Sequence, residues 1–254
     1  MSEMTLENNE HRPIVRIDDT IHRPTHWWTP SVHDLLNYLE RVGFPYSPRV
    51  LGFDDEGREV LTYIEGESGK EGWYKIHSDE GLANFAKLLK SYHEAIADYK
   101  PPTHAEWAYS PNELKPGEIM CHGDFGPWNI AWDGETPVGI LDWDFVLPAK
   151  PEYDILYALQ YSAPFRDDET TVKWHHFTEV PDRKRRIQIF LDAYGTSLSN
   201  VVDGVVKVQR QSIVHVKHLA DRGLQPQMDW VKDGTLDNIE KQAQWSEDNR
   251  LLFE

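Results

Sequence analysis

The chain has 254 residues, with 43 Asp+Glu against 26 Lys+Arg, which gives a formal net charge of −17. Nucleic acids and anionic membranes are bound by clustered basic side chains, so this balance argues against both kinds of partner. Hydrophobic residues make up 39% of the chain, which excludes a natively disordered protein. The single cysteine, Cys121, excludes a disulfide framework, and the chain carries no apolar run long enough for a signal peptide or membrane span. We therefore expect a cytoplasmic protein, of an oligomeric state that the sequence does not define.

Residues 13–64 predict a small β-rich lobe with one helix. In chain order we expect a hairpin at 14–17 and 20–23, a helix from Thr29 to Gly43, and strands at 49–53 and 59–64. The acidic pair Asp18-Asp19 separates two β-branched runs, as in a hairpin turn. Thr29 followed by Pro30 is typical of a helix start, with Thr29 as the N-cap. The chain reaches its first predicted strand only at Ile14, because the residues before it are polar and acidic.

Helices dominate from Asp79 onward. Apolar residues at helical spacing predict a helix that ends before Pro101, and later helices are expected at 153–161, 182–194, 200–222 and 235–250. Residues 118–146 instead read as short strands separated by loops. We therefore expect an α+β protein with a small N-terminal lobe (1–66) and a helical C-terminal lobe (67–254).

Two short segments carry the residues suited to catalysis. The first is His122-Gly123-Asp124, followed five residues after the aspartate by Asn129. Gly126 and Pro127 prevent a regular helix between them, so a loop can direct a carboxylate and a carboxamide at one point.

The second segment is an apolar strand that runs into the acidic turn Asp142-Trp143-Asp144. The two segments together offer an aspartate that can accept a hydroxyl proton, and an asparagine and an aspartate that can share Mg²⁺ through oxygen ligands. Phosphoryl transfer from a nucleotide requires this set of groups.

The pattern His122-Gly123-Asp124-x-x-x-x-Asn129, followed by Ile140-Leu141-Asp142-Trp143, resembles the aminoglycoside phosphotransferase/choline kinase-like family, which is itself similar to protein kinases. The resemblance implies a protein kinase-like two-lobed fold with a truncated N-lobe. It implies that Asp124 is the catalytic aspartate, that His122 orients its loop, and that Asn129 and Asp142 bind Mg²⁺.

The resemblance also implies a nucleotide site, for ATP or GTP, between the lobes. The family's hinge strand would correspond to Thr62, Tyr63 and Ile64, so their backbone would meet the base. This chain has no glycine-rich phosphate loop, and Arg23 stands where the strand should supply a phosphate-binding lysine. The helix that should bring a glutamate near its start carries Val32-His33-Asp34 instead.

Several other residues have two interpretations. Asp144 and Glu152 are candidate substrate-binding residues, although Asp144 could also be a second metal ligand or cap the turn after the strand. Asp154 is expected to be a helix N-cap. The Trp27-Trp28 pair, Trp73, Trp107 and Trp174 could line a ligand cleft, but packing is the expected role for them. The acidic composition, with the family likeness, suggests a cationic, aminoglycoside-like acceptor.

Three functions are therefore compatible with the sequence. The first is a small-molecule kinase that phosphorylates a hydroxyl group. The second is a kinase-like protein that binds nucleotide or ligand with little or no catalysis, since the phosphate loop is missing. The third uses Asp142-Trp143-Asp144 as the Asp-x-Asp metal site of a phosphatase or glycosyltransferase.

Overall fold

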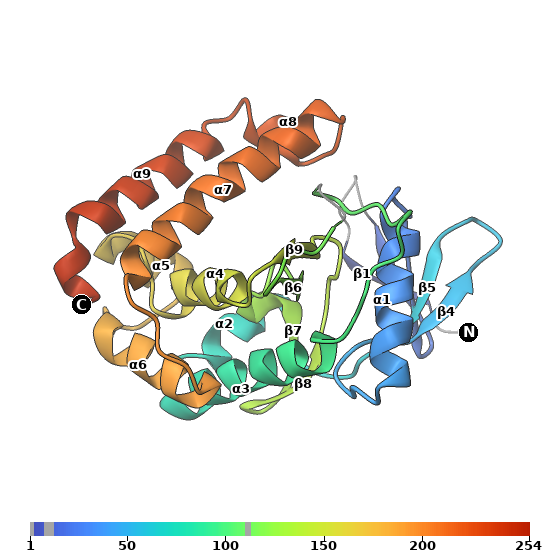
Figure 1. Ribbon diagram of the computed structural model, residues 1–254, viewed down its shortest axis with the longest axis horizontal. Helices are drawn as coiled ribbons and strands as arrows, with labels where there is room; N and C mark the ends of the chain where they lie inside the picture. Colours follow the sequence, from blue (N-terminus) through green and yellow to red (C-terminus); the bar gives the residue numbers. More distant parts are fainter. Residues whose placement is uncertain (1–2, 8–12, 110–112) are drawn as a thin grey trace.

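A computed structural model describes residues 3–7, 13–109 and 113–254, and the chain runs from a small β-sheet into a mostly helical part (Figure 1). The described strands of this sheet are all antiparallel and lie in the order β1-β2-β3-β5-β4. They are β1 (Glu3–Glu7), β2 (Ile14–Ile17), β3 (Thr20–Arg23), β4 (Val50–Phe53) and β5 (Glu59–Thr62). The predicted hairpin is β2–β3, so that prediction is confirmed.

Strand β1 corrects the expectation that the first strand begins at Ile14. It pairs antiparallel with β2, with Glu3 opposite Ile17 and Thr5 opposite Val15. It is the edge of the sheet, where backbone pairing with one neighbour is enough to hold a strand. A polar segment can therefore be a strand here without the alternation of apolar residues on which the sequence-based prediction depended.

Helix α1 (Thr29–Arg41) lies beside this sheet and begins one residue earlier than expected (Figure 1). Trp28 holds the N-cap position, and Thr29 is the first helical residue. The Thr29 hydroxyl accepts a hydrogen bond from the backbone N–H of His26 at 2.9 Å, so it stabilises the preceding loop. The prediction of Thr29 as the N-cap is therefore wrong by one position. Gly43, with φ of +77°, follows the helix as predicted.

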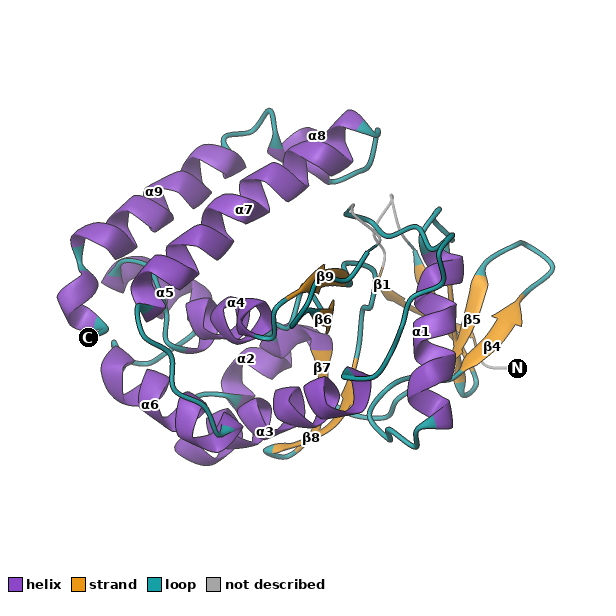
Figure 2. Cartoon of the chain, in the orientation of Figure 1, coloured by secondary structure: helices purple, strands orange, loops and turns teal. Residues whose placement is uncertain are grey.

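The rest of the chain is mainly helical (Figure 2). The described helices are α2 (Gly72–Lys75), α3 (Asp79–Ile96), α4 (Glu152–Ser162), α5 (Asp168–His175), α6 (Arg183–Tyr194), α7 (Val201–Asp221), α8 (Gln227–Trp230) and α9 (Thr235–Asp248). The predicted helices correspond to α3, α4, α6, α7 and α9, whereas α2, α5 and α8 are short and were not predicted. Among the helices described, none is long and apolar enough to cross a membrane.

Short strands lie between the sheet and the large helices, whereas the 3-10 turns occur there and after α9. The strands form two antiparallel pairs, β6 (Ile119–Cys121) with β9 (Leu147–Ala149) and β7 (Ile130–Asp133) with β8 (Thr136–Ile140). The 3-10 turns are η1 (Gly69–Glu71), η2 (Pro127–Asn129) and η3 (Arg250–Leu252). These pairs carry the two segments that the sequence marks for catalysis.

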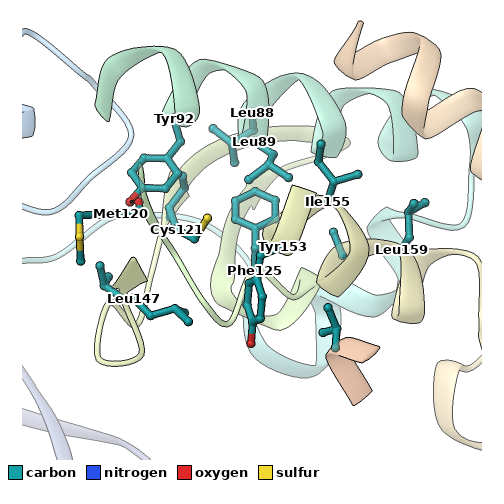
Figure 3. Packing of buried hydrophobic residues seen from close by; sticks show 14 of the residues in the cluster. Leu88, Leu89, Tyr92, Met120, Cys121, Phe125, Leu147, Tyr153, Ile155 and Leu159 are labelled. Atoms are coloured by element: carbon teal, nitrogen blue, oxygen red, sulfur yellow. Dashed lines mark hydrogen bonds between the residues drawn. The ribbon is translucent and has the colours of Figure 1, made fainter. Parts of the chain in front are cut away.

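The buried face of α3 holds the base of the first catalytic segment (Figure 3). The Tyr92 hydroxyl donates a hydrogen bond to the Met120 carbonyl at 2.6 Å, and the Phe125 ring stacks on Phe85 with centroids 4.8 Å apart. All four side chains are fully buried. The Asp124 loop, which we define as residues 121–129, is therefore fixed to the core at its start and at its middle.

The linker after β5 is fixed to the helical part as well. Glu67 and Trp132 exchange backbone hydrogen bonds of 2.8 and 2.9 Å, and Ile140 donates its N–H to the Tyr46 carbonyl at 2.6 Å. The β7–β8 pair is thus hydrogen-bonded to the N-terminal part of the chain and to the linker that follows it. The site described below forms where the N-terminal part meets the helical part.

Candidate active site

The two catalytic segments of the sequence lie side by side. The backbone N–H of Leu141 donates to the Asn129 carbonyl at 2.7 Å, directly beside the pairing of Ile130 with Ile140 in the β7–β8 hairpin. Asn129 ends the Asp124 loop, and Asp142 follows Leu141. The hairpin therefore brings the expected metal-binding residues to one place.

Asp124 is held by two side chains. Its Oδ2 accepts a hydrogen bond from the Asn129 amide at 2.8 Å, and its Oδ1 accepts one from the Tyr157 hydroxyl of α4. Burial raises the pKa of Asp124 to about 7, and the nearby charge of Asp142 acts in the same direction. A carboxyl with a pKa near neutrality is suited to proton transfer at physiological pH.

His122 lies at the base of the loop and is fully buried. Its Nε2 donates to the Leu141 carbonyl at 3.0 Å, and its Nδ1 accepts the Asp124 backbone N–H at 3.3 Å. Burial lowers the pKa of His122, which keeps the ring neutral. The histidine thus links the Asp124 loop to the segment before Asp142, which is the geometry that an orienting role requires.

Asp154 is a buried residue of α4 whose contacts the sequence did not indicate. Its oxygens accept the backbone N–H groups of His122 at 2.7 Å and Gly123 at 2.9 Å, and His93 bonds it at 3.1 Å. Burial opposes the charged form, but these hydrogen bonds outweigh it and hold the pKa of Asp154 below its usual value. The N-cap position of α4 belongs to Pro151, so the prediction of Asp154 as a cap is wrong.

Arg23 is buried between carboxylates. Its Nε lies 2.6 Å from Glu59, its Nη1 3.3 Å from Asp142 and its Nη2 3.0 Å from Asp144. Burial disfavours its charge, but the three carboxylates together hold the pKa of Arg23 above its usual value. The phosphate-binding residue expected on this strand is therefore an ion-pair centre beside the acidic turn.

One of the carboxylates that pair with Arg23 belongs to Glu59, a residue that the sequence analysis did not connect with the site. The family pattern puts a glutamate on the helix that follows Arg23, where this chain has His33. In the structure His33 bonds Glu59 of β5 at 2.9 Å, and Glu59 pairs with Arg23. The carboxylate that balances the cation thus comes from the neighbouring strand, and the helix reaches it through a histidine.

The acidic turn carries more negative charge than Arg23 neutralises. Asp142 has a φ of +52° and a side chain that is 32% exposed, whereas the Asp144 side chain is 3% exposed. The Asn129 amide nitrogen donates to Asp124, so its oxygen is directed the other way. Carboxylate and amide oxygens are hard donors, and this set fits a Mg²⁺ ion.

The remaining candidates lie at the edges of the site. Thr62 and Tyr63 donate their backbone N–H groups to the carbonyls of Arg49 and Asp19, at 2.9 and 2.8 Å. Ile64 packs against Gly139 of β8, in the space that a side chain there would occupy. Glu152 begins α4 and is exposed.

A cavity of about 470 Å³ opens beside Asp124. Its wall comes from the Asp124 loop, α2, α4, α7, α8 and α9, and much of it is aromatic, including Trp73, Trp128, Tyr153, Tyr157, Tyr161 and Trp230. Trp174 of α5 also lines it. Trp73 and Trp174 thus line a cavity rather than only packing, whereas Trp28 and Trp107 are buried in the core as expected. Tyr157 and the distant helices could not be assigned to the site from the sequence, because nothing local identifies which turn of a helix faces a loop.

Comparison with known proteins yields consistent matches. Residues 104–186 match the model of the family described as "Phosphotransferase enzyme family". The chain is 31% identical over 199 residues to the trifolitoxin immunity protein of Rhizobium leguminosarum bv. trifolii, covering 77% of this chain and 75% of that protein.

Solved structures share the fold. A choline/ethanolamine kinase family protein from Mesorhizobium loti superposes with a TM-score of 0.62 at 15% identity, covering 97% of this chain and 88% of that one. The ternary complex of streptomycin, ATP and APH(2″)-IIa gives a TM-score of 0.61 at 12% identity, covering 97% and 93%. The expected kinase-like two-lobed α+β fold is confirmed.

Proposed function

This chain belongs to the phosphotransferase enzyme family, and from that membership we propose that it transfers the γ-phosphoryl group of ATP or GTP to a hydroxyl group of a small acceptor. Phosphotransferases of this kind use an alcohol group as the acceptor. The observation that carries the proposal is the hydrogen bond from Leu141 to Asn129, since it brings the segment of Asp142 to the Asp124 loop, and Asp124 lines a cavity.

Asp124 serves as the base. As the acceptor oxygen forms its bond to the γ-phosphorus, the bond from that phosphorus to the β-phosphate oxygen breaks, and a nucleoside diphosphate leaves. The hydroxyl proton passes to the Asp124 carboxylate. Tyr157 and Asn129 hold that carboxylate at the cavity wall, so positioning and proton acceptance come from the same group.

Asn129 and Asp142 would hold Mg²⁺, with Asp144 adding negative charge behind them. The ion, when bound, supplies positive charge that offsets the phosphate oxygens. Arg23 lies next to this Mg²⁺ site, and its nitrogens pair with carboxylates. Its positive charge therefore adds to the electrostatic potential at the phosphate oxygens.

Thr62, Tyr63 and Ile64 would meet the nucleotide base from the strand that joins the two parts. Since two of their N–H groups already bond within the protein, the base would contact carbonyls and the remaining backbone. Few groups remain for the triphosphate, so we expect weak nucleotide binding, with Kd on the order of 0.1–1 mM.

A second candidate function is a kinase-like protein that binds its ligand without phosphorylating it. It is favoured by the ion pairs that occupy Arg23 and by the immunity role in the name of the sequence relative. The Asp-x-Asp metal enzyme is not favoured, because the Asp144 carboxylate is buried against Arg23.

The test combines binding and turnover. Thermal shifts are measured with ATP and GTP, each with and without Mg²⁺, and loss of γ-phosphate is followed by ³¹P NMR with hydroxyl compounds of different charge. A Mg²⁺-dependent shift with acceptor-dependent formation of a phosphate ester supports the kinase. A ligand-induced shift with no ester from any acceptor supports the binding protein.

A further inference from the structure

Arg166 is a buried cation in the loop between α4 and α5. Only 8% of it is exposed, and within the described residues its guanidinium donates no hydrogen bond and forms no ion pair. Its contact is with the Tyr161 ring, at 5.6 Å from the centroid. An arginine that is buried without a carboxylate is costly, and such groups are retained where a ligand supplies the missing charge.

The backbone around Arg166 is rigid. Its carbonyl accepts hydrogen bonds from Arg183 at 2.9 Å and from the Thr171 hydroxyl at 3.3 Å. The neighbouring Asp167 carboxylate does not pair with the guanidinium, because it caps α5 by accepting the N–H and hydroxyl of Thr170. The backbone of Arg166 is thus held in place, while the acid next to it in the sequence is used as a helix cap.

Arg166 lines the same cavity as Asp124. Among the described residues of that lining, these two are the ones that carry a charge, since burial lowers the pKa of His215 to about 4 and leaves it neutral. Most of the remaining lining is aromatic or apolar. The cavity therefore offers a base, a cation and a wall that is otherwise mostly aromatic or apolar.

We propose that the acceptor is a hydroxyl-bearing organic anion with an aromatic or apolar body, and that Arg166 binds its carboxylate or equivalent anionic group. The proposal rests on the proposed function for the identity of the reacting hydroxyl. The planar guanidinium suits a carboxylate through paired hydrogen bonds, and the aromatic wall suits the body of the ligand.

A polycationic acceptor fits this cavity poorly. Aromatic faces can hold one ammonium group, but several buried together need carboxylates as counter-charges, and the described lining provides Asp124, which the reaction itself uses. Arg166 would also repel such a ligand. The many acids behind the net charge of −17 therefore do not form the acceptor site.

The space continues beyond Arg166. A second cavity of about 580 Å³ shares Arg166 and Trp174 with the first and adds one acid, the α5 cap Asp167, and one cation, Lys241 of α9. The first cavity has room for a small aromatic acid. The two cavities together have room for a longer anion, such as the carboxyl end of a short peptide. The two sources share the chemistry that Arg166 recognises.

The test uses ligands that share one body and carry an anionic, a neutral or a cationic group. Binding of 4-(hydroxymethyl)benzoate, 4-(hydroxymethyl)benzamide and 4-(hydroxymethyl)benzylamine is measured by ligand-observed NMR without nucleotide. A second arm compares N-acetyl-Phe-Ser with its carboxyl-terminal amide. We expect the carboxylate to bind about tenfold or more tightly than its amide in at least one arm, as charge-assisted hydrogen bonds imply, and the benzylamine to bind most weakly. The arm with the stronger preference for the carboxylate shows whether the ligand is a small aromatic acid or a peptide carboxyl terminus.

Variants assign the preference to Arg166. Arg166→Gln should remove it and Arg166→Lys should keep part of it, whereas Arg185→Gln, at an exposed arginine of α6, should leave it unchanged. The proposal is overturned if both carboxylates fail to bind at millimolar concentration, if amides bind equally well, or if Arg166→Gln keeps the preference. Because no nucleotide is present, a failure of phosphoryl transfer leaves this result standing, and the reverse also holds.

Discussion

The Asp154 carboxylate accepts the backbone N–H of His122 at 2.7 Å, although the two residues are 32 positions apart. Its other oxygen accepts the N–H of Gly123 at 2.9 Å. These are the two residues before Asp124. One buried side chain on α4 thereby fixes the conformation from which the proposed base is presented.

Asp154→Asn should weaken both folding and turnover. The amide would turn an NH₂ group toward one of the two backbone N–H groups and leave a buried donor without an acceptor, at a cost of about 1–3 kcal/mol. We expect urea unfolding to show a loss of that size and kcat to fall while nucleotide Kd is unchanged. The control is Asp133→Asn, at an exposed residue of β7. Wild-type stability and kcat in Asp154→Asn would contradict this role.

The sequence predicted those parts of the fold whose signals are local. The β2–β3 hairpin, the long amphipathic helix α3 and the approximate starts of the later helices follow from turn residues and apolar spacing. Strand β1 was missed because an edge strand depends on backbone pairing with β2, which its own residues do not reveal.

The site was predicted only as far as its motifs extend. Asp124, Asn129 and Asp142 could be recognised by their spacing, but the ion pair of Arg23 with Glu59 joins residues whose relation depends on sheet register. The aromatic cavity could not be foreseen either, since its wall comes from several helices that are distant in the chain.

The stability of the protein should depend on Asp124 in a pH-dependent way. Its pKa in the folded state, about 7, lies above the usual value of 3.8, so stability from the protonated form is full at low pH and is lost as pH rises toward 7. Asp124→Asn, which cannot ionise, should raise Tm over wild type most at pH 8, less at pH 5, and have little effect at pH 3. Calorimetric scans in EDTA check this. A Tm difference that does not change with pH would show that Asp124 ionises normally.

Asp142 should contribute mainly to Mg²⁺-dependent nucleotide binding, and Asp144 mainly to the stability of the fold. Asp142 is partly exposed and suited to a metal, whereas Asp144 is buried against Arg23. Asp142→Ala should weaken Mg²⁺-dependent nucleotide binding, and Asp144→Ala should mainly lower the free energy of unfolding. Calorimetric titration of Mg²⁺–ATP and urea unfolding of both variants separate the effects. A larger loss of Mg²⁺-dependent binding in Asp144→Ala would move the metal to that residue.

Arg23→Ala should destabilise the fold by about 3–5 kcal/mol, because it leaves Glu59, Asp142 and Asp144 without their shared counter-charge. Arg23→Lys keeps one positive charge and should lose less. Chemical unfolding measures both, and titration of ATP reports the accompanying change in nucleotide affinity. A stable Arg23→Ala protein that binds nucleotide as well as wild type would contradict the central position of this residue.

The most direct test of the account is the rate of phosphoryl transfer by wild type and Asp124→Asn at pH 8 with Mg²⁺ and an acceptor. Asn keeps the size of the side chain and removes the base, so turnover should fall by about 10²- to 10⁴-fold. Nucleotide Kd should stay the same, and Asp55→Asn, at an exposed acid of the β4–β5 turn, should behave as wild type. Transfer by Asp124→Asn within a few-fold of wild type would show that Asp124 is not the base and that the reaction takes place without it.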